Sequence, residues 1–254
     1  MEHDTKIIAV AGKGGVGKTT LAAAMVRRLT ELFPDKRILA IDADPAVGLS
    51  PCLGVEVTLT LDEIRHTIIE SVEQGKNREA LDLVAASRYR ILDALVEKDG
   101  FAFLAIGRPE SEGCYCSING YLKNVITMIS DEFDYVVIDG EAGIEQVNRR
   151  VLEKVTHLLL VSDQSRKGVQ VASTIKEVAD SLVMYDKVGA VINRVTDPSL
   201  NRYIDIPGVE ILAFIPTDEA HAANDIRGES VFALPESSQV YQGALEVMKK
   251  LEFI

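Results

Sequence analysis

The chain has 254 residues, of which 47% are hydrophobic and 26% charged, a composition typical of folded globular proteins rather than disordered ones. Its 39 acidic residues outnumber 27 basic ones, and the resulting net charge of −12 disfavours nucleic acid and anionic membranes as partners. No apolar run reaches the roughly 20 residues that cross a bilayer, and no signal peptide is recognisable, so we expect a cytoplasmic protein.

Short β-branched runs alternate with helical patterns along the chain. The expected strands are Lys6–Ala11, Arg37–Asp42, Phe101–Ile106, Tyr135–Asp139, His157–Ser162, Lys187–Asn193 and Glu210–Ile215. The expected helices are Lys18–Leu32, Asn119–Asp131, Gln146–Val155, Gly168–Val183 and Ser238–Leu251. This alternation predicts an α/β fold, a doubly wound and mainly parallel sheet with helices on both faces, which binds ligands at the carboxyl ends of its strands. The stretch Leu61–Lys98 reads as two helices with no strand between them, a helical insertion on a single domain spanning residues 1–254.

A phosphate-binding loop follows the first expected strand. The stretch 12–19 reads GKGGVGKT and matches G-x-x-x-x-G-K-[ST] between a strand and a helix, the context that this motif requires. Its glycines let backbone N–H groups turn toward phosphate oxygens, and the helix N-terminus adds a favourable dipole. Lys18 is expected to reach the β- and γ-phosphates of ATP, and the Thr19 hydroxyl to ligate Mg²⁺. The expected nucleotide-binding residues of this loop are Gly12, Lys13, Gly14, Gly15, Val16, Gly17, Lys18, Thr19 and Thr20.

The general phosphate-loop motif requires no lysine at position 13, but this loop has a second lysine there, Lys13. The pattern K-G-G-V-G-K-T resembles the deviant Walker A ATPases, the family of P-loop NTPases that includes MinD, ParA, the arsenite-pump ATPase and the nitrogenase iron protein. The resemblance covers nearly the whole chain. It implies ATP hydrolysis and a homodimer in which Lys13 crosses the interface and touches the partner's ATP.

Acidic residues stand at the ends of two expected strands. Asp42 and Asp44 are two positions apart, so both can face the phosphates. The resemblance places them in a switch segment and implies that Asp44 orients the attacking water while Asp42 supports the water shell of the metal. Asp139 ends an apolar strand in the manner of a Walker B motif and is expected to hold Mg²⁺ through water. The expected catalytic residues are Lys13, Lys18, Asp44 and Asp139.

Two further strand ends carry residues suited to the base of the nucleotide. Asn193 and Arg194 end one strand, and Pro216 and Asp218 follow another. The resemblance implies that an asparagine and a proline–acid turn at these places hold adenine. An asparagine amide can offer both a donor and an acceptor to a base edge.

The pair Cys114 and Cys116 forms a Cys-x-Cys motif after the strand Phe101–Ile106. The chain has three cysteines, an odd number, which in the cytoplasm favours metal or redox chemistry over a disulfide framework. Two thiolates can chelate one soft metal, Zn²⁺ in a tetrahedral site or Ni²⁺ in a planar one, but one chain supplies only two of the four ligands. A two-fold dimer would supply all four.

A narrower resemblance combines this motif with the stretches 107–110 and 139–145. Together they resemble the CooC-type accessory ATPases, which implies ATP-dependent insertion of nickel into a nickel-dependent carbon monoxide dehydrogenase or a related metalloenzyme. One departure is Gln146, where this pattern leads us to expect a histidine. Two alternatives stay open, a MinD/ParA-like positioning ATPase on membrane or DNA, and an ATP-dependent reductase with an iron–sulfur cluster between its subunits.

Overall fold

The computed structural model describes residues 5–107, 116–140 and 154–254. Within these ranges an eight-stranded sheet has the order β3-β4-β2-β5-β1-β6-β7-β8, and every neighbouring pair is parallel except β3 with β4. The fold class predicted from the sequence is therefore confirmed. The strands are β1 (Lys6–Gly12), β2 (Ile38–Asp42), β3 (Val96–Lys98), β4 (Phe101–Ala105), β5 (Tyr135–Asp139), β6 (His157–Ser162), β7 (Lys187–Val195) and β8 (Ile211–Pro216).

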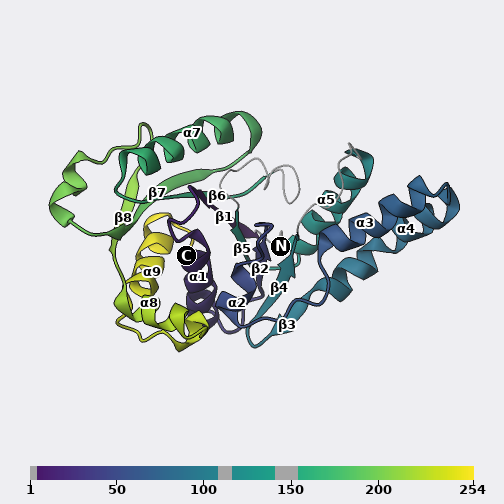
Figure 1. The fold of residues 1–254 in the computed structure, drawn as a ribbon, viewed down its shortest axis with the longest axis horizontal. Coiled ribbons are helices and arrows are strands. Elements are labelled where there is room, and N and C mark those ends of the chain that lie inside the picture. The colour runs from purple at the N-terminus through teal and green to yellow at the C-terminus, as the bar shows by residue number, and fades with distance from the viewer. Residues whose placement is uncertain (1–4, 108–115, 141–153) are drawn as a thin grey trace.

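Helices cover both faces of the sheet. In Figure 1, α7 lies over one face, while α1 and α9 lie against the other. The helices are α1 (Lys18–Leu32), α2 (Leu49–Leu53), α3 (Leu61–Glu73), α4 (Asn77–Ala94), α5 (Cys116–Ser130), α7 (Arg166–Leu182), α8 (Glu219–Ile226) and α9 (Gln239–Lys250). Two short 3-10 helices, η1 (Pro198–Tyr203) and η2 (Val231–Ala233), complete the described elements. No helix in the described ranges is long and apolar enough to cross a bilayer.

The sheet separates two apolar cores, because successive side chains of a strand point to opposite faces. In β1, Ile8 and Val10 pack with residues of α1, α2 and α9, whereas Ala9 and Ala11 pack with residues of α3, α4, α5 and α7. All four side chains are fully buried. The continuous apolar run that predicts this strand thus arises from burial on both faces.

The predicted insertion is a hairpin of α3 and α4, which projects from the sheet on the side of β4 and β3 (Figure 1). Thr60 begins it with a capping box, in which its side chain accepts from the backbone N–H of Glu63. No strand lies between α3 and α4, as predicted, but the last three residues of the stretch, 96–98, form β3, antiparallel to β4. The predicted helix Gln146–Val155 falls almost wholly outside the described residues.

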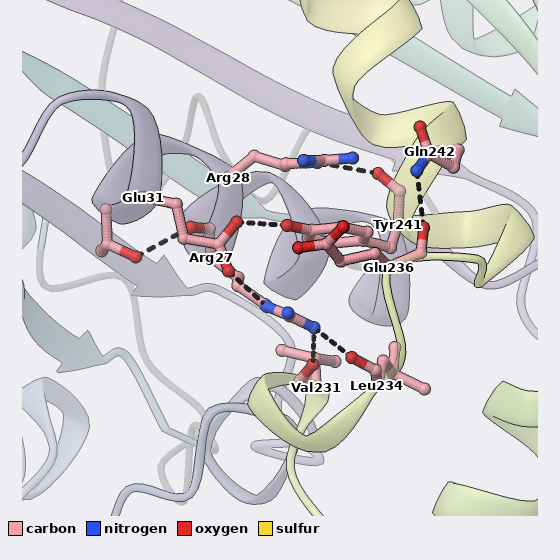
Figure 2. A network of polar contacts seen from close by, with 9 residues as sticks. Arg27, Arg28, Glu31, Val231, Leu234, Glu236, Tyr241 and Gln242 are labelled. Carbon is pink, nitrogen blue, oxygen red and sulfur yellow. Dashed lines mark hydrogen bonds and ion pairs between the residues drawn. The ribbon is translucent and has the colours of Figure 1, made fainter.

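Arg27 joins α1 to the C-terminal part of the chain (Figure 2). The residue is 8% exposed, and one guanidinium nitrogen donates to the carbonyl oxygens of Val231 at 2.9 Å and Leu234 at 2.7 Å. Its Nε donates to Glu31 at 2.7 Å, and Glu31 also accepts the hydroxyl of Tyr241 from α9. This network fixes the helix that carries the phosphate loop.

Candidate functional site

The phosphate loop lies between β1 and α1, at the carboxyl edge of the sheet. Gly12 has a φ of 155°, and a Cβ there would lie 2.0 Å from the carbonyl oxygen of Val161 on β6. Gly17 has a φ of 93°, and its Cβ would lie 2.5 Å from the side-chain nitrogen of Asn193. Only glycine fits these two positions. Because Gly17 caps α1 without a side-chain bond, the first N–H groups of the helix stay available to an anion.

Both lysines of the motif have partners within the chain. The Nζ of Lys18 is 3.3 Å from the backbone oxygen of Lys13, and the side chain of Lys18 is buried. The Nζ of Lys13 forms an ion pair with Asp163, which follows β6, at 3.3 Å. Burial raises the pKa of Asp163, but hydrogen bonds from Ser165 and Lys13 outweigh it and hold that pKa below its ordinary value.

Two fully buried carboxylates end adjacent strands. Asp42 and Asp139 are paired positions in the register of β2 and β5, and both are 0% exposed. Asp42 accepts the backbone N–H groups of Leu49 at 2.8 Å and Asp44 at 3.1 Å. Neither carboxylate oxygen of Asp139 has a hydrogen-bond partner among the described residues.

Burial is the main influence on the acidity of both groups. It raises the pKa of Asp42 to about 6, against the hydrogen bonds from Leu49 and Asp44. It raises the pKa of Asp139 to about 7, with the negative charge of Asp42 adding to the rise and the nearby Thr19 hydroxyl opposing it. An unpartnered buried carboxylate is costly, so a cation at this position would remove a large penalty.

Asp44 lies in the loop after β2. Its side chain accepts the N–H of Ala46 at 2.9 Å, and its backbone oxygen accepts the N–H of Val47 at 2.9 Å. Val47 has a φ of 50°, an uncommon conformation for a β-branched residue. The loop that carries Asp44 is thus folded tightly beside Asp42.

The four residues predicted near adenine have different environments. Asn193, 5% exposed, donates from its side chain to the backbone oxygen of Val16 at 2.9 Å, so β7 contacts the phosphate loop directly. Arg194 is exposed with a φ of 57°, and Pro216 is an exposed end of β8. Asp218 caps α8, and its other carboxylate oxygen accepts from Ser238 and Val240 at the start of α9. The carboxylate of Asp218 therefore connects the N-termini of α8 and α9.

Sequence reasoning did not single out Asp163, the partner of Lys13. The signal was present, since Asp163 follows an apolar strand just as Asp139 ends one. It also overlooked His221, whose Nε2 lies 3.0 Å from the hydroxyl of Thr20. The two residues are 201 positions apart, and no motif or periodicity in the sequence indicates their contact.

The cysteines lie partly outside the described residues. Cys114 is in the stretch 108–115, which the structure does not describe, and Cys116 is the first residue of α5. Among the described residues there is no group of three or more histidine, cysteine or acidic side chains placed to hold a metal. Cys52 is half-buried on α2, and burial raises the pKa of its thiol to about 11.

Comparison with known proteins decides the family. Residues 7–231 match the model of the CobQ/CobB/MinD/ParA nucleotide binding domain. The chain belongs to this family. A relative from Methanocaldococcus jannaschii, described as an uncharacterised ATP-binding protein, is 34% identical over 249 residues, which cover 96% of this chain and 98% of the relative.

More distant relatives differ in their described roles. The carbon monoxide dehydrogenase accessory protein CooC of Rhodospirillum rubrum is 28% identical over 244 residues, covering 89% of each chain. Among solved structures, MinD of Pyrococcus horikoshii, complexed with Mg-ADP, has a TM-score of 0.70 at 20% identity and covers 98% of this chain and 96% of its own. MinD of Aquifex aeolicus has a TM-score of 0.69 at 21% identity, with 98% of both chains covered.

This MinD/ParA-family protein is an ATPase, and its strand-end residues fit Mg²⁺. Mg²⁺ prefers hard oxygen ligands. The site offers the unpartnered oxygens of Asp139, the carboxylate of Asp42 on the neighbouring strand and the hydroxyl of Thr19. Mg²⁺ bound there would neutralise charge on the β- and γ-phosphates. The chain itself presents the N–H groups of α1 and the buried ammonium of Lys18 at the same place, where they would hold the phosphates.

The affinity of the ATPase for Mg·ADP is expected to rise with pH up to about 7 and then level off. A proton on Asp139 competes with the metal, because the pKa of this buried carboxyl is about 7 and an ordinary aspartate pKa is 3.8. Below pH 7 we expect a loss approaching about tenfold per pH unit. The free energy of unfolding of the metal-free protein has the opposite pH dependence. The native state holds a proton that the unfolded chain releases between pH 4 and 7, so stability falls as pH rises through this window.

Isothermal titration calorimetry from pH 5.5 to 8.5, with and without Mg²⁺, measures this effect. Asp139→Asn should flatten the profile and weaken binding of Mg·ADP, while binding of ADP without metal stays close to that of the parent. A pH-independent affinity for Mg·ADP in the unmodified protein would contradict the assignment of Asp139.

Proposed function

We propose that this ATPase is a cytoplasmic metallochaperone that dimerises with ATP and helps to insert nickel into a carbon monoxide dehydrogenase-type metalloenzyme. The observation that carries the proposal is where the Cys-x-Cys motif falls. In the sequence Cys114 lies between the end of β4 and Cys116, which begins α5. Because β4 is parallel to β2, β4 ends at the sheet edge where Asp42 and the phosphate loop lie. Metal and nucleotide would thus lie at the same edge of the sheet, with β2 and β5 between β4 and β1.

The similarity to the CooC accessory protein, 28% identical over 89% of this chain, supports the same function. Cys114 and Cys116 would supply two thiolates, and a second copy of the chain two more, which completes a four-ligand site on a two-fold axis. Nickel, or zinc as a competitor, is cargo in this scheme. The thiolates need a reducing compartment, which is why we assign the cytoplasm.

ATP binding would control the assembly of this site. In the proposed cycle Lys13 exchanges Asp163 for the partner's ATP, and the dimer closes. Asp44 then positions the attacking water, and hydrolysis lets the subunits separate and release the metal to the client enzyme. We assign adenine binding to Asn193, Arg194, Pro216 and Asp218, with the backbone of the last rather than its engaged carboxylate facing the base.

Metal content measured together with oligomeric state tests the proposal. Metal-free protein loaded with Ni²⁺ or Zn²⁺, with and without an ATP analogue, is separated by size exclusion and analysed for metal. We expect about one metal per dimer with nucleotide, and loss of this metal in Cys114→Ser and Cys116→Ser. Cys52→Ser is the matched control, because this half-buried thiol lies on α2, and it should retain the metal.

The outcomes separate metal binding from ATP binding. A nucleotide-dependent dimer without metal would overturn the metallochaperone proposal and leave the ATPase intact. A brown protein containing iron would favour the iron–sulfur alternative instead.

A second candidate, a MinD-like positioning ATPase, is favoured by the likeness to MinD structures. Against it stands the packing of α9. Val240, Ala244, Val247 and Met248 of α9 are buried in the core with α1, so this helix serves the fold rather than a membrane. Co-sedimentation with anionic liposomes that requires ATP would revive this candidate.

A further inference from the structure

The side chain of His221 contacts the phosphate-loop helix from outside the motif. His221 lies in the first turn of α8, and its Nε2 is 3.0 Å from the hydroxyl oxygen of Thr20. Thr20 follows Thr19 in the first turn of α1 and is 9% exposed. The contact therefore reaches the helix end whose backbone N–H groups are open to an anion.

The hydrogen-bond pattern around the imidazole determines its tautomer. The other ring nitrogen of His221, Nδ1, is buried and has no hydrogen-bond partner among the described residues. A buried N–H without an acceptor is rarer and costlier than a buried lone pair without a donor. We therefore assign the proton to Nε2, which donates to the oxygen of Thr20.

This donation leaves the hydrogen of the Thr20 hydroxyl uncommitted. Its oxygen accepts from His221, and that hydroxyl makes no other hydrogen bond in the described part of the chain. The hydroxyl is thus an oriented donor without an acceptor. Hydrogen bonds in series also polarise one another, so the imidazole makes this hydroxyl a better donor.

His221 is held by elements that do not belong to the phosphate loop. Asp218 accepts the N–H of His221 at 3.0 Å with one oxygen, and the hydroxyl of Ser238 at 2.6 Å with the other. The start of α8 is therefore tied to the start of α9, and α9 packs against α1. These contacts hold the imidazole of His221 in place beside Thr20.

We propose that His221 is a positioning residue of the nucleotide site, which holds the Thr20 hydroxyl as a donor to the phosphate chain of bound ADP or ATP. His221 acts only through Thr20 and touches no reacting atom. The proposal rests on nucleotide binding by the phosphate loop and is independent of the metal cargo. A hydrogen bond to a charged acceptor is worth enough to change affinity by about tenfold.

Calorimetric titration with ADP tests this role through a matched set of variants. In His221→Gln the amide nitrogen falls near the position of Nε2, whereas in His221→Asn it falls near Nδ1. We expect ADP binding to weaken by about tenfold in His221→Asn and in His221→Phe, and His221→Gln to restore most of the affinity. Titration of the unmodified protein in the same buffer shows whether the phosphate loop binds ADP at all.

A double-mutant cycle separates positioning from a merely structural role. Thr20→Val removes the hydroxyl, so adding His221→Phe to it should cause no further loss of ADP affinity. Additive losses in the cycle would overturn the proposal. So would a lowered melting temperature in His221→Phe and His221→Asn with unchanged ADP affinity.

Discussion

Lys18→Gln is expected to lower kcat/KM for ATP by about 1,000-fold or more while the protein stays folded. The ammonium of Lys18 is buried beside the phosphate loop, and its one hydrogen bond to a described residue goes to the backbone oxygen of Lys13 at 3.3 Å. It is therefore free to bind phosphate, and its loss removes the main positive charge that stabilises the transferred group. Steady-state phosphate release measures the effect.

Lys13→Gln is the matched control for this substitution. Lys13 is half-buried and is paired with Asp163 in the isolated chain, so its removal should leave ADP binding to a single subunit nearly unchanged. Lys18→Gln should weaken that binding strongly. Equal ADP affinities in both variants would contradict the separate assignments of the two lysines.

Arg27→Met is expected to lower the free energy of unfolding by about 3 kcal/mol, with a fall in Tm of roughly 6–12 °C. The substitution keeps the apolar stem but removes the donor shared by the carbonyl oxygens of Val231 and Leu234. Both oxygens would then lack the bonds that Figure 2 shows, and buried acceptors without donors are costly. Urea denaturation followed by circular dichroism gives the free energy.

Arg28→Met controls for the loss of charge on the same helix. Arg28 is half-buried and donates to the backbone oxygen of Tyr241 at 3.1 Å, with its guanidinium 3.4 Å from the centre of that aromatic ring. Such a contact is worth about 1 kcal/mol. Equal losses in the free energy of unfolding for Arg27→Met and Arg28→Met would contradict the special role of the Arg27 hydrogen bonds.

The fold was predictable because its strands are continuous apolar runs buried on both faces, a pattern that a single sequence reveals. The strand β3 escaped prediction because Val96, Glu97 and Lys98 have no apolar run, and pairing with β4 alone makes them a strand. The first residues of β2 and β8 were predicted to within one position. The predicted strands begin at Arg37 and Glu210, and the observed strands begin at Ile38 and Ile211.

The candidate site was predictable where a motif names its residues. Lys18 and Asp139 stand at a recognisable loop and strand end, and the structure places both at the carboxyl edge of the sheet. His221 was not predictable, because its contact with Thr20 depends on how α8 is oriented by Asp218. Interactions between elements distant in sequence are decided by packing, which composition and periodicity do not encode.

The central position of β1 has a consequence for the order in which the molecule is made. Its two neighbours are β5 and β6, whose residues leave the ribosome long after the phosphate loop does. At about 5–20 residues per second, the delay of roughly 120–145 residues lasts on the order of 6–30 s. Throughout that time the loop has no sheet beside it to fix its shape. The chain therefore cannot acquire its affinity for ATP before β5 and β6 have been made.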